Sequence, residues 1–233
     1  MPGELIKVEM NNGGQAEAWL TTPDGPGPWP GLVILPEIYN SNHWVREVAD
    51  GYAAEGFMAL APDIYWRQDP GQYLAYTPQG RETGRALGFA MDLQAFTDDM
   101  RCYAAALAGN PACDGKIGTV GFCLGGKLVY LAAARGLVDA GVAYYAVQVE
   151  QHLEEAAALD RPLLMHFAEL DAHVPPESYA VISETLAGKP DVEIHLYPSA
   201  DHGFNRHGYP PYHEASATLA LQRSLDFLRK HLS

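Results

Sequence analysis

A cysteine between closely spaced glycines is the group in this chain best suited to covalent chemistry. The segment Gly121-Phe122-Cys123-Leu124-Gly125-Gly126 follows a strand-like run, 116–120, and precedes a helix-like run, 127–134. A nucleophile on a sharp strand-to-helix turn is flanked by small residues because the backbone there is crowded. The turn places the sulfur at a helix N-terminus, where free N–H groups and the helix dipole favour a thiolate. We therefore predict that Cys123 is a nucleophile.

A nucleophilic cysteine needs a base, and the base needs an orienting group. The strand-like run 163–167 leads into a loop with Asp171, and the run 192–196 leads into a loop with His202. Nucleophile, acid and histidine in this chain order match one arrangement of hydrolase triads. We predict a Cys123, Asp171 and His202 triad. Asp201 is the alternative partner of the histidine, although adjacent side chains usually point apart.

The remaining cysteines and histidines lack this context. Cys102 lies in a helical run and is interpreted as a core residue, and Cys113 is expected to be inert in a loop, 110–115. The chain has nine histidines but no His-Glu-x-x-His or similar spacing, so we predict neither a metal site nor a cofactor. The histidines without catalytic context are His43, His152, His173, His207 and His213.

Alternating apolar runs and helical patterns predict the fold. The expected strands are 5–9, 16–21, 31–35, 58–61, 117–120, 142–147, 163–167 and 192–196. The expected helices are 44–55, 90–108, 126–134, 177–186 and 214–231. Strand and helix alternate from residue 31, which predicts a doubly wound, mostly parallel sheet of about eight strands with helices on both faces. We expect one α/β domain over 1–233, with the site at the carboxyl ends of the strands.

Composition narrows the classes of protein. About half of the 233 residues are hydrophobic, yet there is no continuous apolar run long enough to span a membrane. The first residues do not resemble a secretory signal, and three cysteines without Cys-x-x-Cys pairs argue against a disulfide framework. A net charge of −14 disfavours nucleic acid as a partner. We expect a soluble, cytoplasmic monomer whose partner is a small molecule, and an anionic substrate would require a local cationic pocket.

The loop after the strand 31–35 contributes further candidates. In α/β hydrolases this loop supplies the second N–H of the oxyanion hole, so the two donors would be the backbone N–H groups of Ile38 and Leu124. Glu37 would lie beside the sulfur, where a carboxylate repels a thiolate and can accept the S–H proton. The alternative is that Glu37 is a solvated acid at a strand end.

Several segments together resemble the dienelactone hydrolase (carboxymethylenebutenolidase) family over 32–228. They are 35–39 (Leu-Pro-Glu-Ile-Tyr), 61–65 (Ala-Pro-Asp-Ile-Tyr), the segment around Cys123, Tyr144-Tyr145, the turn 171–175 and 202–206. The resemblance implies an α/β-hydrolase fold and a triad with Glu37 as a fourth member. It further implies a resting thiol that becomes a thiolate when substrate moves the glutamate, attack on a lactone carbonyl, an acyl-enzyme and hydrolysis.

The family grips a substrate carboxylate with two arginines, and Arg81 and Arg206 stand at the matching places. A guanidinium suits a carboxylate, although either arginine could instead be a surface residue in an ion pair. Tyr145 is implied to line the pocket, and Trp66 and Tyr39 are further candidate walls or plain core residues. The chain has Arg85 and Gly88 where the family carries aromatic residues, which leaves the identity of the lactone open.

These observations favour a cofactor-free cysteine hydrolase that acts on a small, carboxylate-bearing lactone or ester. A broader carboxylesterase or thioesterase of the same fold is the alternative among enzymes. A non-catalytic binding module is the alternative from another class, because a fold does not fix a function.

Overall fold

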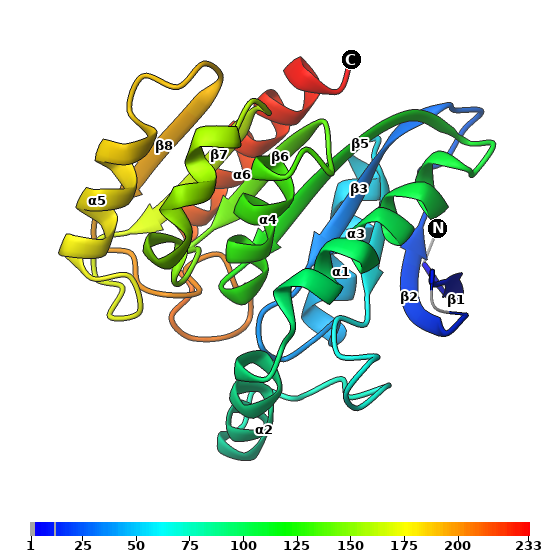
Figure 1. Ribbon diagram of the computed structural model, residues 1–233, viewed down its shortest axis with the longest axis horizontal. Helices are drawn as coiled ribbons and strands as arrows, with labels where there is room; N and C mark the ends of the chain where they lie inside the picture. The colour runs from blue at the N-terminus through cyan, green and yellow to red at the C-terminus, as the bar shows by residue number, and fades with distance from the viewer. Residues whose placement is uncertain (1–2, 12) are drawn as a thin grey trace. The chain divides into compact units, whose positions relative to one another are not determined.

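The computed structural model describes residues 3–11 and 13–233 (Figure 1). The chain divides into two compact units, 1–119 and 120–233. The division falls within strand β5 (Cys113–Phe122). Cys113 therefore begins a strand, and the prediction of a loop over 110–115 was wrong at its end. The prediction of a single domain over 1–233 stays a prediction.

The first unit is built on five neighbouring strands in the order β1-β2-β4-β3-β5. Their bounds are β1 Glu4–Glu9, β2 Gln15–Thr21, β3 Trp29–Leu35 and β4 Met58–Pro62, followed by the first part of β5. β2 runs antiparallel to β1 and β4, whereas β3 and β4 are parallel. Leu32 and its three successors in β3 are fully buried, as expected for a strand covered on both faces. The core of this unit thus surrounds the strand that leads to Glu37.

Three helices belong to the first unit: α1 (His43–Ala54), α2 (Pro78–Phe89) and α3 (Leu93–Ala108). α2 was not predicted. The predicted helix over 90–108 begins only at Leu93, because the Asp92 side chain accepts hydrogen bonds from the N–H groups of Gln94 and Ala95 and so caps α3. Thr77 caps α2 in the same way through the N–H of Gly80.

The second unit continues the strand order as β5-β6-β7-β8, and β6 (Ala140–Tyr144), β7 (Leu163–Ala168) and β8 (Val192–Tyr197) are parallel. Its helices are α4 (Leu124–Ala134), the 3₁₀ segment η1 (Val149–Ala158), α5 (Pro176–Leu186) and α6 (Glu214–His231). In Figure 1, α4 lies in front of β6 and α6 lies behind it, and both contact this strand. Every residue of β6 and β7 is buried. The loops that follow these strands therefore start from well-packed positions in the core.

β6 ends three residues earlier than the strand predicted over 142–147. Tyr145 and Gln148 adopt positive φ angles of 36° and 59°, which interrupt a strand. The chain then turns into η1, an element that the sequence pattern did not reveal.

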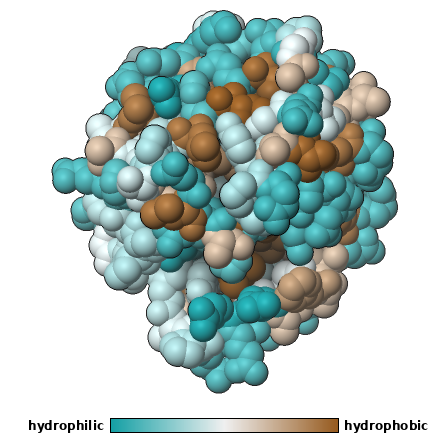
Figure 2. Space-filling model, turned by 90° about the vertical axis from the view of Figure 1, so that its left-hand side faces the viewer, coloured by the Kyte–Doolittle hydropathy of each residue, from teal (hydrophilic) through white to brown (hydrophobic). Residues whose placement is uncertain are grey.

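The surface around α5 and β8 is mostly hydrophilic, with separate hydrophobic groups between polar ones (Figure 2). Exposed apolar side chains of the second unit include Leu170, Val181 and Leu196. In the described part of the chain, no helix combines the length and the apolar character needed to cross a membrane.

Candidate active site

Cys123 lies at the junction of β5 and α4 in a strained backbone conformation. Its φ and ψ angles are 54° and −114°, a region that residues other than glycine rarely adopt. Its N–H donates to the carbonyl oxygen of Tyr144 at 3.0 Å, which ties the turn to the end of β6. The residue as a whole is half-buried, unlike the fully buried residues of the core around it. Leu124 begins α4, and its N–H is one of the first-turn groups that have no acceptor within a helix.

The glycine before the cysteine is required by close packing. A Cβ on Gly121 would lie 2.3 Å from the carbonyl oxygen of Gly125 and 2.8 Å from a methyl group of Val129. The first turn of α4 therefore presses directly on the end of β5. This crowding is what the spacing of small residues around Cys123 predicted.

His202 connects the cysteine with a buried carboxylate. Its Nδ1 lies 2.8 Å from Oδ2 of Asp171, whose side chain is fully buried, whereas 14% of the His202 side chain is exposed. Cys123 forms a further side-chain hydrogen bond with His202. Asp201 accepts a hydrogen bond from the backbone N–H of His202 at 2.6 Å, so the two aspartates contact different parts of the same residue.

The surroundings of His202 favour its charged form. Burial alone would lower the pKa of His202, but negative charge on Cys123 and the hydrogen bonds with Asp171 and Cys123 outweigh burial and raise the pKa to about 10. A protonated imidazole beside a thiolate is the arrangement that activates a cysteine nucleophile.

Two aromatic rings hold the imidazole edge to face. The ring centroids of Tyr145 and His173 lie 4.8 Å and 4.7 Å from that of His202. The hydroxyl of Tyr145 donates to Oδ1 of Asn205 at 2.7 Å, and the N–H of His173 donates to Oδ1 of Asp171 at 2.8 Å. Sequence reasoning missed His173 and Asn205, although each lies within three residues of a predicted triad member.

Tyr145 is fully buried, which differs from the expectation that it lines a substrate pocket. Its ring packs against His202 and its hydroxyl is used by Asn205. The geometry therefore favours a role in positioning the imidazole over direct contact with substrate.

Arg206 lies on the turn that follows His202. Its N–H donates to the carbonyl oxygen of Gly203 at 2.9 Å, and a Cβ on Gly203 would lie 2.5 Å from Nη2 of Arg206. The guanidinium thus folds over this glycine and stays close to the loop that carries the imidazole.

The remaining predicted site residues belong to the first unit. Glu37 follows β3, is 1% exposed and accepts a hydrogen bond from the hydroxyl of Tyr76 at 3.1 Å. It is not a solvated acid, so that interpretation was wrong. Tyr39 stacks edge to face on Tyr76 with ring centroids 4.5 Å apart.

α2 packs closely against the loop that carries Ile38. A Cβ on Gly84 would lie 2.2 Å from the carbonyl oxygen of Ile38, and the hydroxyl of Tyr65 lies 3.2 Å from the carbonyl oxygens of both residues. Arg81 lies in the first turn of α2 and is exposed, as is Arg85, whose guanidinium lies over Phe89. The contact between Gly84 and Ile38 therefore fixes where Arg81 stands relative to the Glu37 loop.

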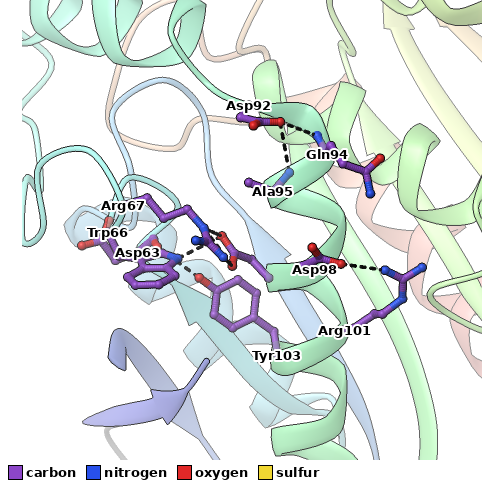
Figure 3. A network of polar contacts seen from close by, with 10 residues as sticks. Asp63, Trp66, Arg67, Asp92, Gln94, Ala95, Asp98, Arg101 and Tyr103 are labelled. Carbon is purple, nitrogen blue, oxygen red and sulfur yellow. Dashed lines mark hydrogen bonds and ion pairs between the residues drawn. The ribbon is translucent and has the colours of Figure 1, made fainter. Parts of the chain in front are cut away.

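Trp66 belongs to a separate polar network that joins the segment after β4 to Asp99 of α3 (Figure 3). Its Nε1 donates to Oδ2 of Asp99 at 3.0 Å, and Nη2 of Arg67 lies 2.6 Å from Oδ1 of the same carboxylate. Arg67 also stacks over the Trp66 ring at 4.5 Å. These contacts support the interpretation of Trp66 as a structural residue.

One group of side chains in the described part of the chain has the spacing of metal ligands. Ligand atoms of His152, Glu154 and Glu155 lie within 4.8 Å of one another. Arg135 already binds Glu155 through two hydrogen bonds of 2.6 and 2.7 Å, so this carboxylate is balanced by a protein cation.

The model of the dienelactone hydrolase family matches residues 16–232, nearly the whole chain. The chain belongs to the dienelactone hydrolase family. Carboxymethylenebutenolidase of Pseudomonas putida is 36% identical over 228 residues, which cover 97% of this chain and 95% of that protein. Carboxymethylenebutenolidase 1 of Cupriavidus pinatubonensis is 33% identical over 232 residues, with coverage of 98% and 97%.

One solved structure is similar in sequence as well as in fold, and a second shares the fold alone. The crystal structure of the "Putative Dienelactone Hydrolase" from Klebsiella pneumoniae subsp. pneumoniae MGH 78578 matches with a TM-score of 0.88 at 26% identity, covering 98% of each chain. The alpha/beta hydrolase GrgF from Penicillium sp. sh18 shares the fold with a TM-score of 0.74 at 16% identity, covering 100% of this chain and 99% of that one. The chain is thus a hydrolase that acts on ester bonds, with an α/β-hydrolase fold of eight mostly parallel strands.

Proposed function

We propose that this dienelactone hydrolase family member hydrolyses a small carboxylate-bearing lactone or ester through a covalent thioester on Cys123. The observation that carries the proposal is the connection from the strained, half-buried Cys123 through His202 to the fully buried Asp171. The three side chains provide a nucleophile, a proton carrier and an orienting anion in one hydrogen-bonded line.

The reaction begins when the Cys123 thiolate attacks the carbonyl carbon and the carbonyl oxygen becomes an oxyanion. The N–H of Leu124, at the N-terminus of α4, is the donor that the second unit provides for this oxyanion. When the tetrahedral intermediate collapses, the C–O bond of the ester breaks and the leaving alkoxide takes a proton from His202. In a lactone the resulting alcohol remains attached to the acyl group.

Hydrolysis of the thioester restores the enzyme. His202, now neutral, removes a proton from water while the oxygen attacks the thioester carbonyl. The C–S bond then breaks, the carboxylic acid product leaves, and Cys123 returns as a thiolate beside the imidazolium. Asp171 keeps the Nδ1–H of the imidazole in place through both steps.

We propose further roles for residues of the first unit on the basis of family membership. We propose Ile38 as the second oxyanion donor and Glu37 as the group that exchanges a proton with the Cys123 thiol before attack. The burial of Glu37 supports this role, because a carboxylate enclosed by the protein, here with a hydrogen bond from Tyr76, can exchange a proton with a protein group rather than with solvent. Arg206 and Arg81 are proposed to bind the substrate carboxylate.

Trapping of the acyl-enzyme tests the mechanism. Intact-mass spectrometry of the protein mixed with a slow lactone should show a covalent adduct that maps to the peptide with Cys123. Cys123→Ala should abolish both the adduct and hydrolysis, whereas Cys102→Ala, a change at a buried cysteine of α3, should leave the adduct in place. Full hydrolytic activity in folded Cys123→Ala protein would refute the proposal. The cytoplasmic location, the monomeric state and the independence from cofactors stay predictions from the sequence.

A further inference from the structure

A buried lysine lies one helical turn after the nucleophile. Lys127 is 7% exposed, and its backbone N–H donates to the carbonyl oxygen of Cys123 at 3.2 Å. Its Nζ donates to Oε1 of Gln148 at 3.0 Å. The triad mechanism makes no use of this group.

The position is unfavourable for a cation in two ways. Burial removes the ammonium from water. The first turn of a helix also repels positive charge, because its unpaired N–H groups form the positive end of the helix dipole. The partner amide of Gln148 accepts a hydrogen bond but carries no charge that could balance the ammonium. A nearby anion is therefore needed to favour a lysine here.

The segment that anchors Lys127 is itself hydrogen-bonded to the turn that carries Cys123. Gln148 adopts a positive φ of 59° at the start of η1, and the N–H of the preceding Val147 donates to the carbonyl oxygen of Cys123 at 3.4 Å. The carbonyl oxygen of Cys123 thus accepts hydrogen bonds from two backbone N–H groups, that of Lys127 in α4 and that of Val147 in the loop before η1. The amide of Gln148 consequently holds the ammonium at a defined place relative to Cys123.

We propose that Lys127 is a positioning residue of the nucleophile: its ammonium, anchored by Gln148, stabilises the thiolate of Cys123. This inference rests on the proposed function of Cys123. It means that two cations stabilise the thiolate, the ammonium of Lys127 from α4 and the imidazolium of His202.

The electrostatics support this assignment. Burial lowers the pKa of Lys127, and negative charge at Cys123, followed by Glu150 of η1, opposes that effect. Such coupling is reciprocal, because an anion that favours the ammonium is favoured by it to the same degree. The charges that act on Lys127 in the described second unit are therefore Cys123, at the N-cap of α4, and Glu150 on η1.

The pH dependence of Cys123 alkylation tests the proposal without any turnover. Iodoacetamide is uncharged and reacts with the thiolate, so its rate at each pH follows the fraction of thiolate. Peptide mass spectrometry separates Cys123 from Cys102 and Cys113. In Lys127→Met the midpoint should move to higher pH, and the rate below the midpoint should fall by about tenfold, the effect of one pKa unit. Lys127→Arg should keep most of the original rate.

The controls separate charge from packing. Lys116→Met makes the same charge change at an exposed residue of β5 and should leave the alkylation profile unchanged. Methionine fills similar space, and the thermal midpoint of Lys127→Met shows whether the packing of α4 is kept. A folded Lys127→Met protein whose Cys123 alkylation depends on pH as in the wild type would overturn the proposal. Equal shifts of the alkylation midpoint in Lys127→Met and Lys127→Arg would also overturn it.

A second variant covers the case in which Lys127→Met does not fold. Gln148→Leu removes the anchor of the ammonium and should shift the profile in the same direction by a smaller amount. An unchanged profile in Gln148→Leu would then overturn the proposal. If Lys127 does not position the nucleophile, Cys123→Ala should still lose hydrolysis. The two proposals can therefore be refuted independently of each other.

Discussion

The Nδ1 atom of His202 lies 2.8 Å from Oδ2 of Asp171, and no exposed surface remains on that aspartate side chain. The other carboxylate oxygen of Asp171 is held by the N–H of His173 at 2.8 Å. Both oxygens therefore have a donor, and the carboxylate cannot rotate freely. The orientation of the imidazole is thus set by the loop after β7, and every residue of β7 is buried.

Asp171→Asn should lower kcat by about 10² to 10⁴, the usual contribution of a positioned acid–base group. The amide would no longer favour the imidazolium or hold the Nδ1–H tautomer. Asp201→Asn is the matched control, because Asp201 contacts only the backbone N–H of His202 among the contacts described above. Steady-state kinetics on one activated ester would compare the two, and equal losses in both variants would contradict the assignment of Asp171.

The raised pKa of His202 predicts how stability depends on pH. Its pKa is about 10 in the folded protein against an ordinary value of 6.5. Between these values the folded state holds a proton that the unfolded chain has released, so the free energy of unfolding should fall as pH rises. The contribution is complete below about 6.5 and is lost as pH rises through about 10.

Urea unfolding of the wild type and of His202→Gln at several pH values would measure this contribution. The difference between the two proteins should shrink from pH 6.5 to pH 10. Cys123→Ser should flatten the wild-type slope, because negative charge on Cys123 is the largest of the effects that raise the pKa of His202. Parallel pH profiles for wild type and His202→Gln would show that the imidazole does not carry this proton.

Arg206→Ala should raise KM for a carboxylate-bearing lactone far more than for a neutral ester of similar size. A charge-assisted hydrogen bond contributes about 1.5 to 3 kcal/mol, which corresponds to roughly a ten- to hundredfold change in KM. Arg85→Ala provides the comparison, since Arg85 is exposed on α2. If Arg206→Ala raises KM by the same factor for both substrates, Arg206 acts on the loop of His202 rather than on the substrate carboxylate.

The turn that carries Cys123 could be predicted from the sequence because its determinants are local. A strand, a crowded turn and a helix follow one another within a short segment, and Gly121 is required by its contact with Gly125 only four residues away. Asp171 and His202 could be found because each follows an apolar run, and the contact of Asp171 with the imidazole agrees with the argument that adjacent residues point apart. The eight strands were recognisable for the same reason, although β6 ends earlier than expected.

The remaining features depend on contacts between distant residues. α2 is rich in glycine and polar residues, so its pattern is weak, and Gly84 packs against Ile38, which lies 46 positions away. The burial of Tyr145 depends on Asn205 and His202, which come from a different loop. Lys127 looks like an ordinary helical lysine in the sequence, and only its burial beside Cys123 reveals the coupling.

Gly84→Ala should disturb the loop of Glu37 and Ile38. The added Cβ would lie 2.2 Å from the carbonyl oxygen of Ile38, a backbone atom that cannot rotate away. Either α2 or the loop must move, which should lower the free energy of unfolding by about 1 to 3 kcal/mol. Because this contact fixes Arg81 relative to the loop, kcat/KM for a carboxylated lactone should fall as well.

Gly51→Ala is the control for the same substitution in the same unit. Gly51 lies within α1, and an added Cβ there has no heavy atom within 4 Å. Alanine in this helix should raise the free energy of unfolding by about 0.5 to 1 kcal/mol because it restricts the unfolded chain, and activity should not change. Urea denaturation and lactone kinetics would measure both variants. Wild-type stability and activity in Gly84→Ala would mean that α2 tolerates displacement and that its contact with Ile38 does not position the site.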